Sequence, residues 1–301
     1  MGRIRPMTSR CSRQSFRRRS SVGPAHALMV GAMVPAGVVL RVHSVFDRAI
    51  NLEGASTGLL VSLVVRPEDM AATAVLVDHL FDGPVVGEPV MIGVPTGSGH
   101  SAAAKAGEGF SVRVACEGST RWEGRLLGAP LDVDGLTAVV GRLQALVAGH
   151  GRDGGLLALV ADATDTPVTR FAREALEIPG GPDWSRLVGL GIGLTPSGDD
   201  FLTGALLAEA LLDARRVVPG GAAGWHGAID RRAVAGRLEG TTAAGRTLLA
   251  AALEGRFPAY LLALIQATVE GRALAGHHLD HGHSSATDAA CGIIARLRMK
   301  W

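Results

Sequence analysis

The chain has 301 residues, of which 47% are hydrophobic, 19% charged and 4% aromatic. This composition supports a sizeable apolar core and argues against a disordered chain or an aromatic surface for single-stranded nucleic acid. Residues 1–19 contain seven arginines and no acid, so the other residues carry a formal charge of −5 within the total of +2. The body of the protein is therefore mildly acidic, which argues against nucleic acid as its main partner.

The amino terminus predicts a disordered, dispensable basic tail over residues 1–34. Arg17-Arg18-Arg19 precedes the apolar stretch Ala25–Leu40, an order also found in signal peptides. Prolines and glycines interrupt this stretch and no clear cleavage site follows it, so we favour a cytoplasmic protein over an exported one. Three widely spaced cysteines agree with a reducing compartment, and no run reaches the ~18 apolar residues of a membrane span.

Residues 36–148 are predicted to form a β-rich domain, because short Val- and Leu-rich runs alternate with Gly, Pro and Asp. The expected strands are Val38–Val45, Leu59–Val65, Pro89–Val94, Ser111–Cys116 and Trp122–Leu127. A short helix is expected within Pro67–Leu80 and a longer one over Leu136–Val147. The segment Gly93–Ser101 is predicted to be a surface turn, because it lacks the lysine of a phosphate-binding loop.

Residues 150–299 are predicted to form a helical domain that follows a Gly-rich linker. The expected helices are Phe201–Arg215, Thr242–Leu253, Pro258–Val269 and Ser285–Leu297. The first of these is apolar nearly all round, so we expect it to be buried. The fold class is therefore α+β, with the β-rich domain first and the mostly helical domain second.

A loop rich in glycine, Gly189–Asp200, is the strongest functional signal in the sequence. Glycines at alternate positions let backbone amides approach a ligand closely. Gly191, Gly193, Thr195 and Ser197 are therefore candidate substrate-binding residues.

Two adjacent carboxylates end this loop, at Asp199 and Asp200. Ser197 fits the cap of a helix with Asp200 three residues later, as in a capping box. Capping accounts for one carboxylate but not for both. Asp199 and Asp200 are therefore candidate catalytic residues, with Asp200 expected to support the fold and Asp199 the ligand.

A second helix start, Ser285–Gly292, repeats the pattern Ser-x-x-Asp-x-x-x-Gly of Ser197–Gly204. Glycine at the end of each pattern permits two helices to approach closely. We expect both helix starts to face one cleft, which adds Ser284, Ser285 and Asp288 to the candidate substrate-binding residues. The alternative is chance recurrence of a common helix cap.

The loop His277–His283 contains four histidines. His283 lies next to the second helix start and is the candidate catalytic acid and base, because histidine titrates near neutral pH. Zn or Fe would accept such donors, but the loop has no helical framework of metal ligands. A polar loop with one useful histidine is the favoured interpretation.

Arg48 and Asn51 follow the first expected strand and are candidate substrate-binding residues of the first domain. An arginine can grip a carboxylate or a phosphate with two parallel hydrogen bonds. We expect these residues to close the open side of the cleft. The alternative for Arg48 is a surface ion pair with Asp47 or Glu53.

Together these segments resemble the AllH-like family, long a domain of unknown function and associated with oxamate carbamoyltransferase. The matching segments are Ser44-Val-Phe46, Asn51-Leu52, Gly189–Asp200 with Phe201-Leu202 and Gly204, Thr241-Thr242, and Gly282-His-Ser-Ser285 with Asp288. They span about residues 38–298. The chain departs from the family at Ile192, where proline is expected, and at Ala286-Thr287, where glycine commonly follows the serine.

The resemblance implies a subunit of an enzyme in anaerobic allantoin and purine breakdown. That enzyme interconverts oxalurate plus phosphate with oxamate plus carbamoyl phosphate, and its companion subunits include one similar to acyl-CoA synthetases. The expected partners are thus a small anionic carbamoyl or ureido substrate and companion subunits, with no nucleic acid and no membrane. The resemblance also adds Thr242 to the candidate substrate-binding residues.

The candidate residues suit such chemistry. Arg48 and the amides of Gly191–Ser197 would hold an anion, the two aspartates would accept ureido N–H groups, and His283 would move a proton. Two carboxylates repel a phosphate, so Mg²⁺ held by Asp199 or Asp200 is the one cofactor considered. The alternatives are a non-catalytic binding or assembly subunit and a metal-dependent hydrolase that uses His277–His283.

Overall fold

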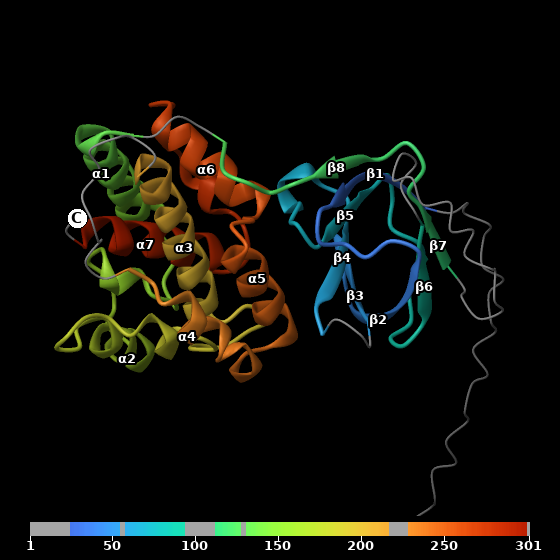
Figure 1. Cartoon of the computed structure of the whole chain (residues 1–301), viewed down its shortest axis with the longest axis horizontal. Helices are drawn as coiled ribbons and strands as arrows, with labels where there is room; N and C mark the ends of the chain where they lie inside the picture. The colour runs from blue at the N-terminus through green and yellow to red at the C-terminus, as the bar shows by residue number, and fades with distance from the viewer. Residues whose placement is uncertain (1–24, 55–57, 94–111, 128–130, 217–227, 300–301) are drawn as a thin grey trace, which may run out of the picture.

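The computed structural model describes residues 25–54, 58–93, 112–127, 131–216 and 228–299. These residues form a β-rich amino-terminal domain and a helical carboxy-terminal domain that lie end to end (Figure 1). The predicted α+β class is therefore confirmed.

Eight strands of the described chain form one sheet in the amino-terminal domain. They are β1 (Ala25–Gly31), β2 (Val38–Phe46), β3 (Ala49–Glu53), β4 (Leu60–Val64), β5 (Ala74–Val77), β6 (Pro89–Ile92), β7 (Val112–Ala115) and β8 (Thr120–Trp122). Antiparallel β2 and β3 are joined by the two-residue turn Asp47-Arg48, so Arg48 lies at the tip of a hairpin.

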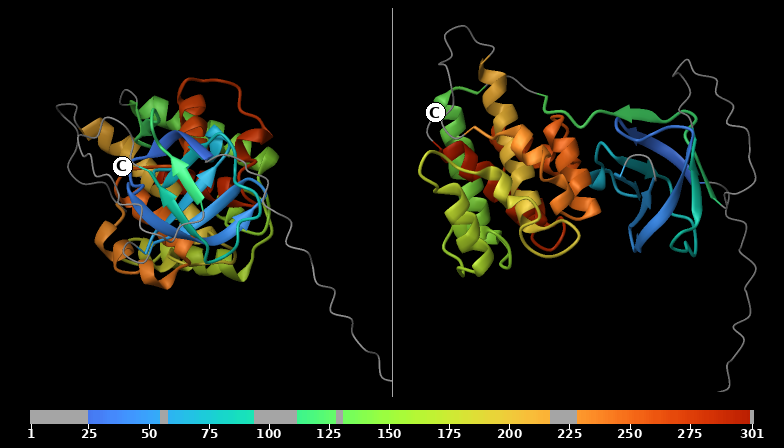
Figure 2. Two further views of the ribbon diagram at one scale, coloured as in Figure 1. Left: turned by 90° about the vertical axis from the view of Figure 1, so that its right-hand side faces the viewer. Right: turned by 60° about the horizontal axis from the view of Figure 1, so that its bottom comes forward.

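This sheet closes on itself in the order β5-β4-β3-β2-β6-β7-β1, because β1 pairs with β5 as well as with β7. The second half of β1 pairs with β8. Inward-facing residues fill the interior, among them Val42, Leu52, Leu63, Val75 and Ile92. Closure pairs the backbone N–H and C=O groups of strands that would otherwise lie at an edge, and it gives the domain its own core. The ring of strands faces the viewer in the left panel of Figure 2.

The sequence predictions need three corrections in this domain. Ala25–Gly31 is a barrel strand, so the prediction of a dispensable tail over residues 1–34 is wrong for its last part, and residues 1–24 lie outside the described residues. The expected helix within Pro67–Leu80 is one 3-10 turn, η1 (Pro67–Asp69), followed by β5, whose four residues are all buried in the sheet. The expected strand Trp122–Leu127 is replaced by β8, and the predicted turn Gly93–Ser101 lies outside the described residues from 94 onward.

The carboxy-terminal domain contains the described helices, and its central pair is α3 and α7. The helices are α1 (Val133–His150), α2 (Pro167–Leu176), α3 (Ser197–Arg216), α4 (Arg231–Ala235), α5 (Ala243–Leu253), α6 (Ala259–Val269) and α7 (Ser285–Arg298). As predicted, α3 is buried along most of its length. Of the described helices, none combines the length and the apolar character needed to cross a membrane.

Helix α1 packs against α7 and α6 and belongs to the helical core. The predicted boundary, which placed Leu136–Val147 in the β-rich domain, is therefore too late in the chain. Helix α2 was not anticipated; it begins at Pro167 after Thr166, whose side chain accepts from the Thr169 amide. A proline in the first turn and a capping threonine are ordinary start signals that the sequence offered.

The crossing of α3 and α7 is the most extensive helix contact of the domain. At Gly204 a side chain would overlap the carbonyl of Ala289, and at Gly292 it would overlap the carbonyl of Phe201. Each glycine thus admits the backbone of the other helix. This bears out the expectation that the repeated glycine permits close approach.

Main-chain hydrogen bonds hold the two domains together. The amide of Phe257 donates to the Gly124 carbonyl at 2.7 Å, and the amide of Ala259 donates to the Met70 carbonyl at 2.8 Å. Both donors lie where the chain enters α6. The start of α6 is therefore fixed to the barrel.

Replacement of Gly292 by alanine should destabilise the protein by about 1–3 kcal/mol, because the added carbon overlaps the Phe201 carbonyl. Gly141→Ala is the matched control. Gly141 is also helical, but a side chain there meets nothing within 4 Å, so this change should stabilise by up to about 1 kcal/mol. Urea unfolding of both variants measures the difference, and equal effects would contradict the close crossing.

Candidate functional site

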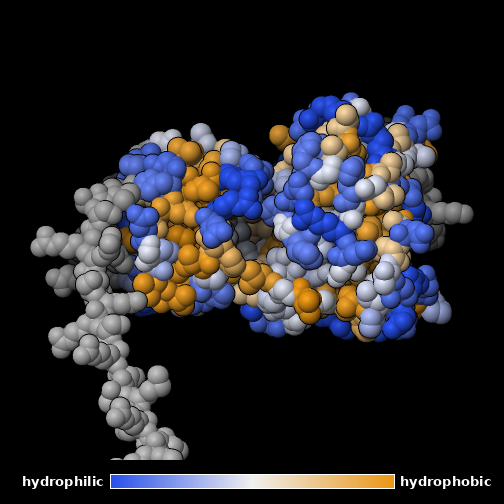
Figure 3. Space-filling view, turned by 180° about the vertical axis from the view of Figure 1, so that it is seen from behind, coloured by the Kyte–Doolittle hydropathy of each residue, from blue (hydrophilic) through white to orange (hydrophobic). Residues whose placement is uncertain are grey.

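A pocket of about 290 Å³ lies where the barrel meets the helical domain. Figure 3 shows the surface hollowed between the two domains. The barrel side contributes Asn51, Ser62, Asp69 and Thr73, and the helical side contributes Thr195, Asp200, Thr247, Arg256, Tyr260, His281 and Ser285 among its polar residues. Apolar residues of both domains complete the wall. Polar groups that converge between apolar walls are typical of a small-molecule site.

The Gly-rich loop leads into α3 through backbone conformations that only glycine adopts easily. Gly189, Gly191 and Gly193 have φ values of 73°, 112° and 105°. Helix α3 begins at Ser197, and the Pro196 carbonyl accepts from two following amides. Ser197 is therefore the first residue of the helix and not its cap, which corrects the predicted capping box.

Asp199 fastens this loop to the start of α5. Its Oδ1 accepts from the Gly189 amide at 2.8 Å, and its Oδ2 accepts from the Thr241 hydroxyl. Burial raises the pKa of Asp199, and these two hydrogen bonds oppose the rise. Thr242 assists, since its hydroxyl caps α5 and also donates to the Leu194 carbonyl. Asp199 and Thr242 thus brace the loop and do not line the pocket.

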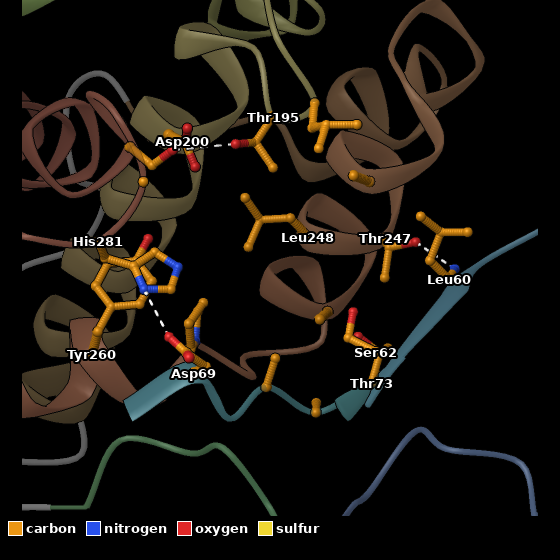
Figure 4. Close-up of a pocket in the computed structure, with 18 of the residues that line it drawn as sticks. Leu60, Ser62, Asp69, Thr73, Thr195, Asp200, Thr247, Leu248, Tyr260 and His281 are labelled. Atoms are coloured by element: carbon orange, nitrogen blue, oxygen red, sulfur yellow. Dashed lines mark hydrogen bonds and ion pairs between the residues drawn. The ribbon is translucent and has the colours of Figure 1, made fainter. Parts of the chain in front are cut away.

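Asp200 does line the pocket, although only 2% of the residue is exposed. Ser285 and Thr195 hydrogen bond to its carboxyl group and oppose the rise of its pKa, while Oδ2 has no partner among the described residues. Figure 4 shows Thr195 beside Asp200. Burial raises the pKa of Asp200 well above its usual range, and the charges of Asp288 and Asp199 add to the rise. The pocket therefore contains a carboxyl group that favours its protonated form and has an unused hydrogen-bonding atom.

Asp288 is buried in α7 and serves the fold. Its Oδ1 accepts from the Leu156 amide at 2.6 Å, and a side chain at Gly155 would overlap the carboxyl group. Burial raises the pKa of Asp288 to about 6, against the hydrogen bonds from Leu156, Ser284 and Ser197. Asp288, Ser284 and Ser197 thus form a polar contact behind the pocket wall.

The two helix starts do meet, as predicted, but each contributes a different group to the pocket. Thr195 and Asp200 come from the first start and Ser285 from the second, and the hydroxyls of Thr195 and Ser285 lie 3.2 Å apart. Gly191, Gly193 and His283 also lie outside the pocket. His283 is exposed, and its carbonyl accepts from Arg152.

The histidine on the pocket wall is His281, which the sequence interpretation did not single out. Its ring stacks on Tyr260, with centroids 4.0 Å apart, and its Nδ1 lies 3.5 Å from Oδ1 of Asp69 (Figure 4). Burial lowers the pKa of His281, and the Asp69 carboxylate opposes this. Burial also raises the pKa of Tyr260, with further contributions from Asp200 and Asp288.

Asn51 lines the pocket from β3, as expected for the first domain. Its side-chain amide donates to Ser44 Oγ at 3.1 Å, and its Oδ1 accepts from Ser62 Oγ at 2.7 Å. These bonds fix the polar wall on the barrel side. Ser44, which is part of the family resemblance, therefore helps to orient the side chain of Asn51.

Arg48 lies on a neighbouring cavity of about 600 Å³, the outer cavity, which shares Ser62, Asp69, Ala71 and His281 with the pocket. Within the described part of the chain Arg48 forms no ion pair, so the alternative of a pair with Asp47 or Glu53 is not realised. Arg48 therefore lies on the outer cavity and not on the pocket wall.

Of the two aspartates considered for Mg²⁺, Asp199 already accepts a protein hydrogen bond at each oxygen, whereas Oδ2 of Asp200 has no partner among the described residues. Among the described residues no group of three or more His, Cys, Asp or Glu side chains is arranged to hold a metal ion. His277 and His278 contact each other with their rings, 4.1 Å apart, in the 3-10 turn η5 (Gly276–Leu279). The hydrolase alternative therefore gains no support from the geometry.

The variants Asp199→Asn and Asp200→Asn should distinguish the aspartate that supports the loop from the aspartate that lines the pocket. Asp199→Asn removes one acceptor from the Gly189 and Thr241 donors and should destabilise by about 1–3 kcal/mol. Asp200→Asn replaces an acid whose ionisation is opposed by burial, so stability at pH 7 should be unchanged or higher. Urea unfolding tests this reversal of the roles expected from the sequence, and a destabilised Asp200→Asn with an unaffected Asp199→Asn would refute it.

Asp288 should make the protein less stable as the pH rises from about 4 to 6. Its folded pKa of about 6 exceeds the ordinary 3.8, so the stabilisation is fully present below 3.8 and is lost as the pH rises through 6. The shift corresponds to about 3 kcal/mol. Urea unfolding at pH 4 and pH 7 should show a smaller pH dependence for Asp288→Asn than for the wild type. The exposed Asp134→Asn on α1 is the control and should keep the wild-type dependence.

No curated protein and no solved structure matches the chain. The family comparison does give a match, and it covers the segment that begins before the Gly-rich loop and ends within α7. The barrel lies outside it. Residues 187–297 match the family model of the oxamate carbamoyltransferase subunit AllH, which confirms for this segment the resemblance expected from the sequence.

Proposed function

We propose that this chain is a cytoplasmic subunit of a carbamoyltransferase that interconverts oxalurate plus phosphate with oxamate plus carbamoyl phosphate in purine breakdown. The observation that supports this most is the coincidence of the family match with the pocket. The matched residues 187–297 supply Thr195, Asp200, His281 and Ser285 to its wall. Companion subunits and a small carbamoyl or ureido substrate are part of the proposal.

The pocket suits a ureido group. Such a group presents N–H donors beside carbonyl acceptors, so it needs a partner that can both accept and donate. Asp200 in its protonated form is such a partner, since its hydroxyl donates and its other oxygen accepts. Hydroxyl groups of Thr195, Ser285 and Ser62 offer further matches on both sides of the pocket. The volume of about 290 Å³ agrees with a substrate of few atoms.

The reaction also needs stabilisation of the oxygen that becomes negative when the carbamoyl carbon is attacked. A protonated Asp200 is a donor fixed in a buried place, so it would act on that oxygen without reorganisation. In this proposal the carboxyl group of Asp200 donates a hydrogen bond to that oxygen. Asn51 and Ser285 orient the substrate from opposite walls.

A second candidate function, that of a binding or assembly subunit, is favoured by the surface of the Gly-rich loop. Ile192 is 91% exposed and Leu194 is 48% exposed at the side of the pocket. Apolar side chains held out on such a loop suit contact with a companion subunit. In that case the pocket would bind the metabolite and the partner would complete the chemistry.

The decisive experiment supplies oxalurate and phosphate to the purified chain, alone and with its companion subunits, and measures carbamoyl phosphate. Turnover by the chain alone supports the catalytic subunit. Turnover only with partners, together with oxamate binding by the chain alone, supports the second candidate. Absence of both turnover and oxamate binding under every condition contradicts the proposed function.

Asp200→Ala should lower kcat of the assembled enzyme by about 10²–10³, because it removes a buried donor from the pocket. The exposed Asp134→Ala on α1 is the matched control and should retain wild-type kcat. Circular dichroism and the melting temperature verify that both variants are folded. Wild-type kcat in a folded Asp200→Ala variant would remove Asp200 from the mechanism.

A further inference from the structure

The pocket and the outer cavity form two adjoining compartments with His281 between them. Four residues line both compartments: Ser62, Asp69, Ala71 and His281. Of these four, Asp69 and His281 carry ionisable side chains, and they face each other across 3.5 Å. A group shared by two cavities can exchange a proton with ligands in both.

The outer cavity has one arginine for an anionic ligand, Arg48, beside the carboxylates of Asp47 and Asp69. Arg48, at the tip of the β2–β3 hairpin, lies on its wall and forms no ion pair within the part of the chain that the structure describes. Arg66 is committed to Glu68 and approaches Asp69 at 3.7 Å. The pocket differs, because its arginine, Arg256, is engaged by the carbonyl and the carboxylate of Glu123. Among the described residues, the arginine without an ion pair thus lies on the outer side of His281.

His281 is held by its surroundings in one orientation. The stacked Tyr260 ring, from α6, covers one face, and Asp69 faces Nδ1, which leaves Nε2 for a ligand. The charged groups that act on the imidazole are Asp69 and Glu68, together with Arg66 and Arg48. Burial lowers the pKa of His281, so the neutral ring, which can accept a proton, predominates at pH 7.

We propose that the outer cavity binds the phosphate through Arg48, and that His281 carries the proton from the attacking phosphate to the leaving nitrogen of a ureido substrate in the pocket. This rests on the proposed function and assigns the two substrates to separate compartments. Asp69 is then a positioning residue, because it acts through the imidazole.

The step balances as follows. An oxygen of HPO₄²⁻ forms a bond to the carbamoyl carbon, and the bond from that carbon to the oxamate nitrogen breaks with its electron pair on nitrogen. His281 takes the phosphate proton at Nε2 and gives it to that nitrogen. The products are carbamoyl phosphate dianion and the oxamate anion, so the total charge of −3 is unchanged, and neither an oxidant nor a reductant is required.

The kinetic test uses the assembled enzyme, and its control is the neighbouring exposed histidine. His281→Gln should lower kcat by about 10²–10⁴ and leave KM for oxalurate nearly unchanged. His283→Gln, on the same loop, should have wild-type kcat. Asp69→Asn should lower kcat less and shift the acidic limb of the kcat profile to lower pH, because the carboxylate that favours the imidazolium is lost. Equal kcat in the two histidine variants overturns the role of His281 while wild-type turnover upholds the proposed function.

The compartment assignment has its own variants. Arg48→Gln should raise KM for phosphate roughly 10- to 100-fold and leave KM for oxalurate unchanged. Arg113→Gln, an exposed barrel arginine paired with Glu117, should change neither constant. A rise in KM for oxalurate alone would place the substrate, and not phosphate, in the outer cavity and would overturn the assignment.

A binding readout on the wild-type chain keeps the test independent of turnover. In the wild-type chain, the imidazole proton resonances of His281, assigned by comparison with Asp69→Asn and His281→Gln, should shift when inorganic phosphate is added. Resonances of His283 should not. If phosphate binds without moving the His281 resonances, the inference fails, whereas a chain that binds neither phosphate nor oxamate and shows no turnover fails the proposed function itself.

Discussion

The whole site depends on how closely α3 and α7 cross. Two glycines, Gly204 and Gly292, let each backbone occupy the place of a side chain on the other helix. The crossing brings Asp200 and Asp288 near enough for the charge of one to raise the pKa of the other. Ionised together in a buried place they would repel strongly, so the fold favours the protonated state. The close packing of α3 and α7 is thus one reason why the pKa of Asp200 in the pocket is raised.

The barrel has a separate role, since it supplies the opposite wall of the pocket and places Arg48 on the outer cavity. Its relation to the helical domain is fixed at the start of α6, through the amides of Phe257 and Ala259. The same segment is followed at once by Tyr260, which supports His281. The fixed domain contact and the pocket are therefore built from neighbouring residues, and a loosened domain contact would disturb the chemistry directly.

The sequence predicted the class of fold, most helices, the importance of the Gly-rich loop and the meeting of the two helix starts. It misassigned Asp199 and Asp200 because neighbouring helix residues point about 100° apart, and the rotation of α3 is set by packing that no local pattern reveals. His281 was passed over for the same reason, since a short loop gives no rule for which side chain turns inward. Strand β1 was not predicted, because its alternation of buried and exposed residues can be recognised only once its pairing with β5 is known.

Closure of the barrel has a consequence for how the chain is made. β1 is the first described strand, yet its partners include β8, and the Thr120 hydroxyl reaches the Leu28 carbonyl across 92 residues of chain. During synthesis β1 emerges long before these partners exist, so its edges stay open until the last strand has left the ribosome. An apolar strand with open edges is a site of faulty association. Chaperones are therefore needed most while the amino-terminal domain is being synthesised and β1 has no partners.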